Sequence, residues 1–414
     1  MKKNSYLFVC SFIFSLSLSI LGFSLVYLLT DRLGFSPAKV GTYIALGSLC
    51  YFLCCNIYQH FCTHLMPQTI IPTAISICLL ASILLALVRN PLIVGFAYCI
   101  IQGSSGFFWP PVMAWFTQGL NEEELNRDIS RFNLCWMGGG LLGPLVGGVL
   151  YHANSILNFL AIYACLVLVL YLLWRLSVRY GESVAAGAAL AETVVEIPHA
   201  PVETGASLKA ASVEAEKLES RRELLRERSL KLFKYRGWMS AFCANAFSGI
   251  LANIFPLYIR DGLGYTEGTA GMLLLFRGIA ALAGFAVFAR LRFWHFNRKW
   301  FVLIHSIVAA LALLFVFSGK NIFMYCIVIF INGFFYAGCY NNSIFHSSAE
   351  KKNAKANLAL HEIFLSLGSM SGAFGGGLCY QRFGMGGTFF ALSLILFAIV
   401  AINIILNRLE NQAV

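Results

Sequence analysis

The sequence predicts an all-α polytopic membrane protein with twelve transmembrane helices arranged as two six-helix repeats. Of its 414 residues 59% are hydrophobic and only 12% are charged, whereas soluble proteins carry about 25% charged residues. Uncharged apolar runs that are long enough to cross a bilayer recur along the whole chain. Segments of the first half also recur in the second half, which indicates a duplication.

The apolar runs define the spans, because a helix needs about 20 apolar residues to cross the hydrocarbon core. The first run follows the basic start MKKNSY. It is longer than the roughly 7 to 15 residues of a signal-peptide core, so we expect a retained helix. The predicted spans are 6–29, 38–60, 69–88, 91–117, 131–152, 155–178, 238–259, 267–290, 300–318, 321–346, 358–381 and 386–407.

One long polar stretch, about 180–236, separates the sixth span from the seventh. It predicts three parts: a six-helix bundle over 1–179, a linker over 180–236 and a second bundle over 237–414. The linker places Glu219 with Arg222, and Glu223 with Arg226, at helical spacing, as in a solvated helix. A calmodulin-like or lipid-binding role for this helix is an alternative.

Lysines and arginines set the orientation, since they accumulate in cytoplasmic loops. With the N-terminus inside, most of them fall on the cytoplasmic side, including eleven between Arg175 and Arg236. We therefore expect a multi-pass protein of the cell (cytoplasmic) membrane, with both termini and the linker in the cytoplasm. The net charge of +11 is explained by these loops, so we expect no nucleic-acid partner. The basic residues left on the outer side are Arg32, Lys39, Arg89, Arg260, Lys320 and Arg382.

Three pairs of segments, each about 229 residues apart, show that six spans have been duplicated into twelve. An even number of spans per half gives both halves the same orientation, which is a parallel repeat. The pairs are DRLGFSPAKVG (31–41) with DGLGYTEGTAG (261–271), YCIIQGSSGFFW (98–109) with YCIVIFINGFFY (325–336), and GGGLLGPLVGGVLY (138–151) with LGSMSGAFGGGLCY (367–380).

Every third span contains an almost wholly aliphatic stretch without glycine, over 70–88, 156–174, 300–317 and 388–406, and the other spans carry small and polar residues. A helix that is apolar on all sides can face lipid, whereas small residues mark helices that pack closely. We expect the third, sixth, ninth and twelfth helices at the periphery.

Together these features resemble the major facilitator superfamily over the whole chain. The most specific match is G-x-x-x-G-P-x-x-G-G on the fifth span, which resembles the motif associated with antiporters in that superfamily. It comprises Gly139, Gly143, Pro144, Gly147 and Gly148. Glycines four apart make a smooth face for close helix approach, and the proline permits a bend. We expect a tight, sliding contact, with static close packing as the alternative.

The chain departs from this family at two motifs. The loop between spans two and three usually reads G-x-x-x-D-R-x-G-R, but here it is NIYQHFCTHLMPQ. Cys99 stands three residues before Gln102-Gly103, where the family has an arginine linked to proton coupling. Proton antiport is therefore weakly supported. The segments FFWPPVMAW (107–115) and RFNLCW (131–136), with the LHE of NLALHEIF, are similar to an uncharacterised branch of the superfamily.

Ionisable residues inside spans are functional candidates, because burying them is expensive. Arg277 lies near the middle of the eighth span, and we expect it to face a central cavity and hold an anionic group or a carboxylate partner. Glu362, with His361, opens the eleventh span and is the best proton carrier or arginine partner. The alternatives for Arg277 are snorkelling to the membrane interface and a purely structural ion pair. For Glu362 and His361 the alternative is a boundary pair at the cytoplasmic surface.

The family fold implies that the first, fourth, seventh and tenth spans line the cavity, where amides orient a solute and aromatic rings supply area. Asp31 and Asp261 occupy equivalent repeat positions at the outer ends of spans one and seven, so we expect them to gate or cap. With two residues added from the fifth span, the predicted substrate-binding residues besides Arg277 are Gln102, Trp109, Asn133, Trp136, Asn245, Asn332, Tyr336 and Asn341.

We expect a secondary transporter that moves a small solute by rocker-switch alternating access, leaning to efflux by antiport, with a proton as the candidate coupling ion. The alternative is uptake or facilitated exchange of a small organic anion or sugar; a transporter-like sensor is more remote. No H-E-x-x-H, phosphate loop or serine-nucleophile motif is present, so we expect no enzyme. The thirteen cysteines form no C-x-x-C pair, and we expect neither metal nor cofactor. We expect a monomer in the bilayer.

Overall fold

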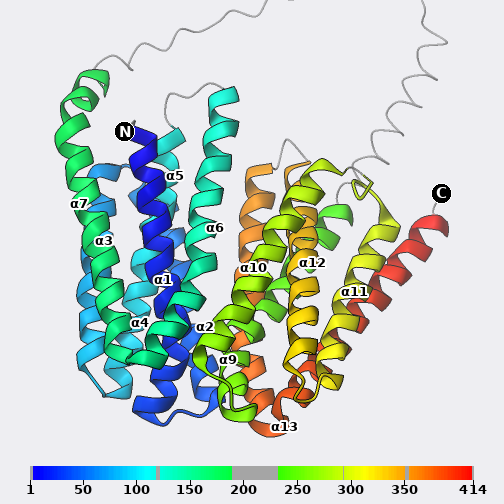
Figure 1. Cartoon of the computed structure of the whole chain (residues 1–414). Coiled ribbons are helices and arrows are strands. Elements are labelled where there is room, and N and C mark those ends of the chain that lie inside the picture. Colours follow the sequence, from blue (N-terminus) through cyan, green and yellow to red (C-terminus); the bar gives the residue numbers. More distant parts are fainter. Residues whose placement is uncertain (1–2, 118–121, 189–231, 292, 350–353, 413–414) are drawn as a thin grey trace, which may run out of the picture.

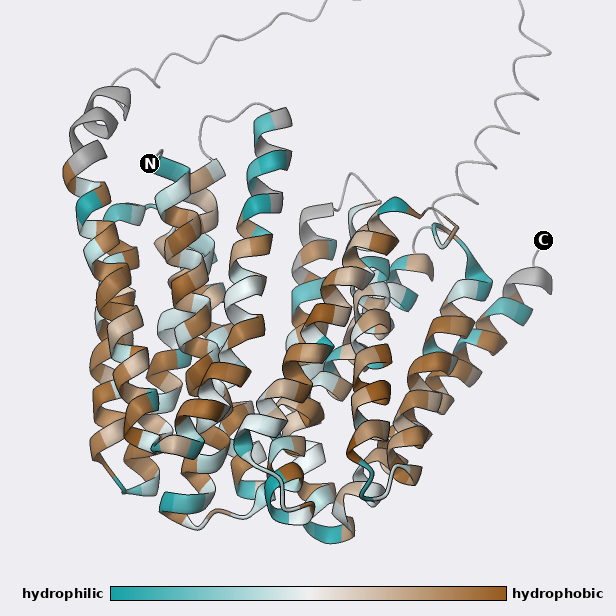
Figure 2. Cartoon of the chain, in the orientation of Figure 1, coloured by the Kyte–Doolittle hydropathy of each residue, from teal (hydrophilic) through white to brown (hydrophobic). Residues whose placement is uncertain are grey.

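The computed structural model describes residues 3–117, 122–188, 232–291, 293–349 and 354–412. The predicted linker helix with Glu219 and Arg222 lies outside these residues. The described chain forms two helical bundles side by side, one from the N-terminal half and one from the C-terminal half (Figure 1). Apolar residues dominate the middle of the bundles, and hydrophilic residues gather toward the helix ends (Figure 2).

The helices follow the predicted spans closely. The N-terminal half contains α1 (Lys3–Leu33), α2 (Pro37–Ile57), η1 (Tyr58–Cys62), α3 (Pro67–Leu87), α4 (Pro91–Gly106), α5 (Trp109–Thr117), α6 (Glu122–Ala153) and α7 (Ser155–Ala188). The C-terminal half contains a helix over 232–253, then α9 (Phe255–Leu257), η2 (Tyr258–Gly262), α10 (Glu267–Arg290), α11 (Arg298–Phe317), α12 (Ile322–Ser348) and α13 (Ala354–Gln412). The elements η1 and η2 are single π-helical turns.

Eleven helices in the described chain are long and apolar enough to cross a membrane. The last one, α13, kinks at Gly384, whose φ of 68° and ψ of −174° are not helical. Glycine adopts a positive φ without steric cost, so this kink divides α13 into two spanning segments. Twelve spans result, and the predicted all-α fold class is confirmed.

Proline and asparagine residues mark the N-terminal ends of several helices. Proline is the first residue of α2, α3 and α4, which suits a position whose N–H has no intrahelical acceptor. Asparagine side chains cap four of the described helices, α4, α7, α11 and α12; the Oδ1 of Asn90, for example, accepts from the Leu92 N–H at 2.9 Å.

The fourth predicted span, 91–117, is interrupted in the structure. Helix α4 ends at Gly106 and α5 begins at Trp109. Pro110 and Pro111 follow at once, and neither has an N–H to donate to the preceding turn. The break turns the chain directly beside the central cavity.

The helices predicted to be peripheral present large apolar side chains on the outside of the bundles. Leu80 on α3 is 67% exposed, Val167 on α7 is 53% exposed and Phe317 on α11 is 75% exposed. Such residues suit contact with lipid tails. These helices pack on members of their own half, such as α3 on α4 and α11 on α12.

The two halves meet along two seams, α6 with α10 and α2 with α13. A methyl group on Gly148 of α6 would meet the Glu267 carbonyl of α10, and one on Gly377 of α13 would meet the Pro37 carbonyl of α2. Gly271 of α10 lies in the same way against the backbone of Pro144.

The seams are equivalent under the repeat. Gly41 of α2 lies against the Ala373 carbonyl, so Gly41 with Ala373 mirrors Gly271 with Pro144. Small residues let two helix backbones approach closely. Equivalent residues of the two sequence repeats therefore make equivalent contacts between the halves, one set on each seam.

Candidate functional site

A cavity of about 320 Å³ lies between the two halves. Helices of both halves contribute to its wall, and most of the lining side chains are polar or aromatic. The lining residues are Leu18, Ser48, Tyr51, Gln102, Ser105, Trp109, Asn245, Leu365, Ser366 and Ser369. Its volume falls at the small end of the roughly 300 to 1,000 Å³ that ligand pockets occupy.

Three of the predicted substrate-binding residues line this cavity directly: Gln102, Trp109 and Asn245. The amide of Gln102 donates to the Tyr98 hydroxyl at 2.8 Å. That of Asn245 donates to the Ala241 carbonyl at 3.1 Å. Each amide nitrogen is thus already bonded within its own helix, which orients the amide group.

Arg277 lies on α10 and is held by neutral groups. Its Nε donates to Oδ1 of Asn332 at 2.9 Å, and its guanidinium also donates to the Ser248 hydroxyl. The guanidinium carbon lies 4.9 Å from the centre of the Tyr336 ring, within the range of a cation–π interaction. No ion pair joins Arg277 to a carboxylate of the described residues, so its positive charge is uncompensated there.

Glu362 and His361 lie near the start of α13 and face in different directions. The His361 side chain is 1% exposed, and its Nδ1 lies 2.7 Å from the Ser343 hydroxyl. The Glu362 side chain is 68% exposed, and its carboxylate is 4.0 Å from His361 Nε2. His361 is thus part of the bundle interior, while Glu362 reaches solvent-accessible space.

The other predicted substrate-binding residues do not line the cavity: Arg277, Asn332, Tyr336, Asn133, Trp136 and Asn341. Trp136 of α6 donates to Oδ1 of Asn133 at 3.1 Å. Its ring lies 6.4 Å from that of Trp109 in an edge-to-face arrangement. Asn341 is half-buried on α12, and the structure does not bring it to the cavity wall.

At the ends of the helices away from the chain termini, a charged cluster joins the halves. Arg260 of η2 contacts Asp31 of α1 at 2.9 Å and Asp261 at 2.7 Å. His152 of α6 lies 3.0 Å from Glu267 of α10. The Arg260 guanidinium also lies over the ring of Tyr27 at 4.7 Å. We call Asp31, Tyr151, His152, Arg260, Asp261 and Glu267 the end cluster.

Tyr151 completes this cluster, since its hydroxyl donates to Asp31 at 2.8 Å. Tyr27 donates to the Pro256 carbonyl at 3.1 Å, a further bond between halves. Every hydrogen bond or ion pair found between the halves of the described chain lies at this end of the molecule. Among the described residues, the polar contacts between the halves are therefore confined to this end.

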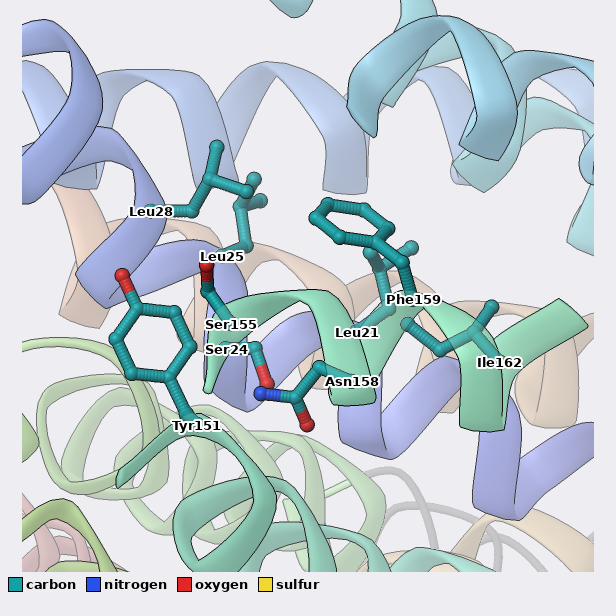
Figure 3. A pocket seen from close by; sticks show the side chains of 9 residues that line it. All are labelled: Leu21, Ser24, Leu25, Leu28, Tyr151, Ser155, Asn158, Phe159 and Ile162. Carbon is teal, nitrogen blue, oxygen red and sulfur yellow. The ribbon is translucent and has the colours of Figure 1, made fainter. Parts of the chain in front are cut away.

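A second, much smaller cavity of about 10 Å³ lies inside the N-terminal bundle, between α1, α6 and α7. Figure 3 shows the Ser24 hydroxyl and the Asn158 amide pointing toward the same space. Neither the Ser24 hydroxyl nor either polar atom of the Asn158 amide has a hydrogen-bond partner among the described residues. Its size is about that of one water molecule, so it is not a site for an organic solute.

Comparison with known proteins decides the family. The model of the Major Facilitator Superfamily matches residues 7–292 and again 237–412. The chain belongs to the major facilitator superfamily. It is therefore a secondary transporter of the membrane, of a family whose members carry small molecules rather than transform them.

Solved structures of other superfamily proteins share the fold. A bacterial homologue of the human lysosomal transporter Spinster, in an inward-facing and unoccupied conformation, has a TM-score of 0.71 at 14% identity, with 99% of this chain and 98% of that chain covered. The nucleoside transporter NupG has a TM-score of 0.67 at 12% identity, with 98% of both chains covered. Tetrameric PepTSo2 has a TM-score of 0.67 at 12% identity, with 99% of both chains covered. No curated protein matches in sequence.

Within this superfamily member, sequence reasoning missed Arg260, His152 and Glu267. The distribution of basic residues predicts Arg260 in an outer loop, although it directly precedes Asp261, the first residue of a repeated segment. The repeated aspartates Asp31 and Asp261 were the feature of the sequence that could have indicated a charged cluster at this end. In the described part of the chain, no three or more His, Cys, Asp or Glu side chains are grouped so that they could hold a metal ion.

Proposed function

We propose that this superfamily transporter exchanges small organic solutes bearing an anionic group, by alternating access of the central cavity. The observation that carries the proposal is Arg277, a guanidinium in a spanning helix with only neutral partners among the described residues. A charge in such a place costs free energy unless it is paired. A bound anion would supply the missing charge.

The two seams support alternating access. Gly148 and Pro144, both from the motif that resembles the antiporter motif, lie on the α6–α10 seam. Gly139, Gly143 and Gly147 of the same motif lie against α1, so the motif gives α6 two smooth faces. On this resemblance we propose exchange, in which the return of the empty carrier is slow and a counter-solute accelerates it.

The end cluster supports a conformation closed at one end. By the distribution of lysine and arginine, the end with both termini is cytoplasmic, so we propose that the cavity is accessible from the cytoplasm. The gating role of Asp31 and Asp261 follows, because releasing Arg260 from Asp31 would separate the halves there.

A thermal-shift screen of the purified protein tests the anion proposal, since a ligand that binds the folded state raises the melting temperature. Sugars, organic anions, amino acids and lipophilic cations would be compared on wild type and Arg277→Ala. Charge-assisted hydrogen bonds contribute about 1.5 to 3 kcal/mol, so anion affinity should fall by roughly 10- to 100-fold in the variant. Arg290→Ala is the matched control, since Arg290 ends the same helix and is exposed.

Counterflow in proteoliposomes tests exchange. Vesicles preloaded with the stabilising anion should take up the labelled anion faster than empty vesicles. Stabilisation by lipophilic cations alone, equal in wild type and Arg277→Ala, would instead indicate a cation exporter in which Arg277 is structural.

A further inference from the structure

The cavity region holds a second uncompensated charge, and its sign is opposite to that of Arg277. The Glu362 carboxylate is 68% exposed. The basic side chain found beside it among the described residues is His361, whose imidazole lies 4.0 Å away, is 1% exposed and carries a charge only when protonated. No lysine or arginine of the described chain forms an ion pair with Glu362.

Glu362 lies on the cavity side of α13. It interacts electrostatically with Tyr51 and Cys55 of α2, across the gap between the halves, and with Tyr340 of α12. Tyr51 lines the cavity, as does Ser366, one helical turn after Glu362. Residues four apart share one face of a helix, so Glu362 is at the edge of the same cavity.

The two charges are connected by the aromatic residues of α12. Arg277 lies over the ring of Tyr336, and that ring also interacts with Glu362. Tyr340 follows one turn later, about 6 Å along the helix, and packs against His361 at 5.0 Å. Arg277 and Glu362 thus lie beside the same stretch of α12, and no ion pair joins them in the described chain.

The opposite wall carries no charge. Ser48, Tyr51, Gln102, Ser105 and Trp109 provide neutral polar and aromatic groups from the N-terminal half. Under the repeat, Gly47 corresponds to Arg277, and Asn133 corresponds to Glu362. The C-terminal half has therefore acquired both charges at positions that are neutral in the N-terminal half.

We propose that the transported solute is a zwitterion, whose anionic group binds Arg277 and whose ammonium group binds Glu362. The proposal rests on the function proposed above and names the solute class for the same cavity. Each protein charge lacks an ionic partner in the described chain, and a solute with two opposite charges compensates both. A simple anion would leave Glu362 unpaired and would be repelled by it.

Binding to the full-length protein in detergent tests the proposal. The probes are the twenty α-amino acids, ω-amino acids of two to six carbons and alanyl-alanine, each beside its N-acetyl and its carboxamide derivative. At least one zwitterion should raise the melting temperature, and both of its derivatives should bind at least tenfold more weakly. Glu362→Gln should remove the preference for the free amine, and Glu362→Asp should retain it.

The outcomes separate this proposal from the proposed function. Equal binding of a zwitterion and its N-acetyl form, lost in Arg277→Ala, would overturn the zwitterion and keep the anion transporter. Anion binding that persists in Arg277→Ala would overturn the anion anchor itself. An unchanged amine preference in Glu362→Gln, with loss of uptake driven by a pH gradient, would identify Glu362 as a proton carrier and overturn the proposal. It is equally overturned if no zwitterion in the panel binds.

Discussion

Arg260 of the C-terminal half holds Asp31 of the N-terminal half at 2.9 Å, and Tyr151 donates to the same carboxylate at 2.8 Å. This arrangement is a bond between halves at one end of the molecule. Asp31 and Asp261 occupy equivalent positions in the two repeats. Arg260 directly precedes Asp261 and binds both aspartates, so both repeats contribute to one cluster.

Breaking this pair should open the fastened end. Charge-assisted hydrogen bonds contribute about 1.5 to 3 kcal/mol, and partial exposure of both side chains places the loss at the lower end. Asp31→Arg should therefore increase amide hydrogen exchange in residues 27–33 and 255–266. The double variant Asp31→Arg with Arg260→Asp should restore protection. Arg382→Ala is the control, since Arg382 is exposed and contacts the ring of its neighbour Phe383. Unchanged exchange in Asp31→Arg would show that the pair does not fasten the halves.

Substituting a glycine of a seam by alanine should also push the two halves apart, in this case by steric clash. A methyl group on Gly148 would meet the Glu267 carbonyl, whereas nothing lies within 4 Å of one on Gly375. Overpacking costs about 1 to 3 kcal/mol, so Gly148→Ala should slow solute exchange in proteoliposomes by about tenfold or more. Gly375→Ala, in a helix of the other seam, should leave the rate unchanged. Similar rates for the two variants would mean that the seam adjusts without cost.

The position of Arg277 depends on a glycine of the neighbouring helix. A methyl group on Gly333 of α12 would meet the backbone of Arg277, so Gly333→Ala should push α10 away from α12. The bond from Arg277 Nε to Asn332, 2.9 Å long, would lengthen. We expect anion affinity to fall at least fivefold, as measured by the thermal shift of the stabilising anion, with the melting temperature of the unliganded protein lowered as well. A variant that lost stability but kept its affinity would separate the packing of Gly333 from the site.

Asn158 and Asn154 should respond in opposite ways to substitution by leucine. Asn158 is 1% exposed, and neither polar atom of its amide has a partner among the described residues. Removing an unsatisfied buried group is neutral or stabilising, so Asn158→Leu should keep or raise the apparent melting temperature. The Oδ1 of Asn154 accepts from the Ile156 N–H at 2.9 Å near the start of α7. Asn154→Leu should therefore cost about 1 kcal/mol and lower the melting temperature. A marked loss in Asn158→Leu would indicate a water molecule bridging Asn158 and Ser24.

Hydropathy and spacing were sufficient for the fold, because the bilayer admits few structures and requires one apolar run per crossing. They also located the kink between the last two spans, where Gly384 lies. They did not predict the break between Gly106 and Trp109, although the prolines that follow were visible. An apolar run shows that a segment crosses the membrane, but it does not show where the backbone turns within it.

The candidate site was less accessible to sequence reasoning. The location of Arg277 in a span follows from hydropathy, but its neutral partners Ser248 and Asn332 lie on two other helices. In the sequence Arg260 cannot be distinguished from other charged loop residues, whereas in the structure it lies beside Asp31. Contacts between elements far apart in the chain depend on tertiary packing, and one sequence contains no record of them.

The equivalence of the two seams has a consequence for inhibition. If rocking displaces α6 against α10, the repeat requires a matching displacement of α2 against α13. Preventing movement at either seam would then stop the whole transport cycle. A small antibody fragment or cyclic peptide that wedges beside Gly148 and Glu267 would arrest the carrier without entering its cavity, and increasing solute concentration would not relieve the block.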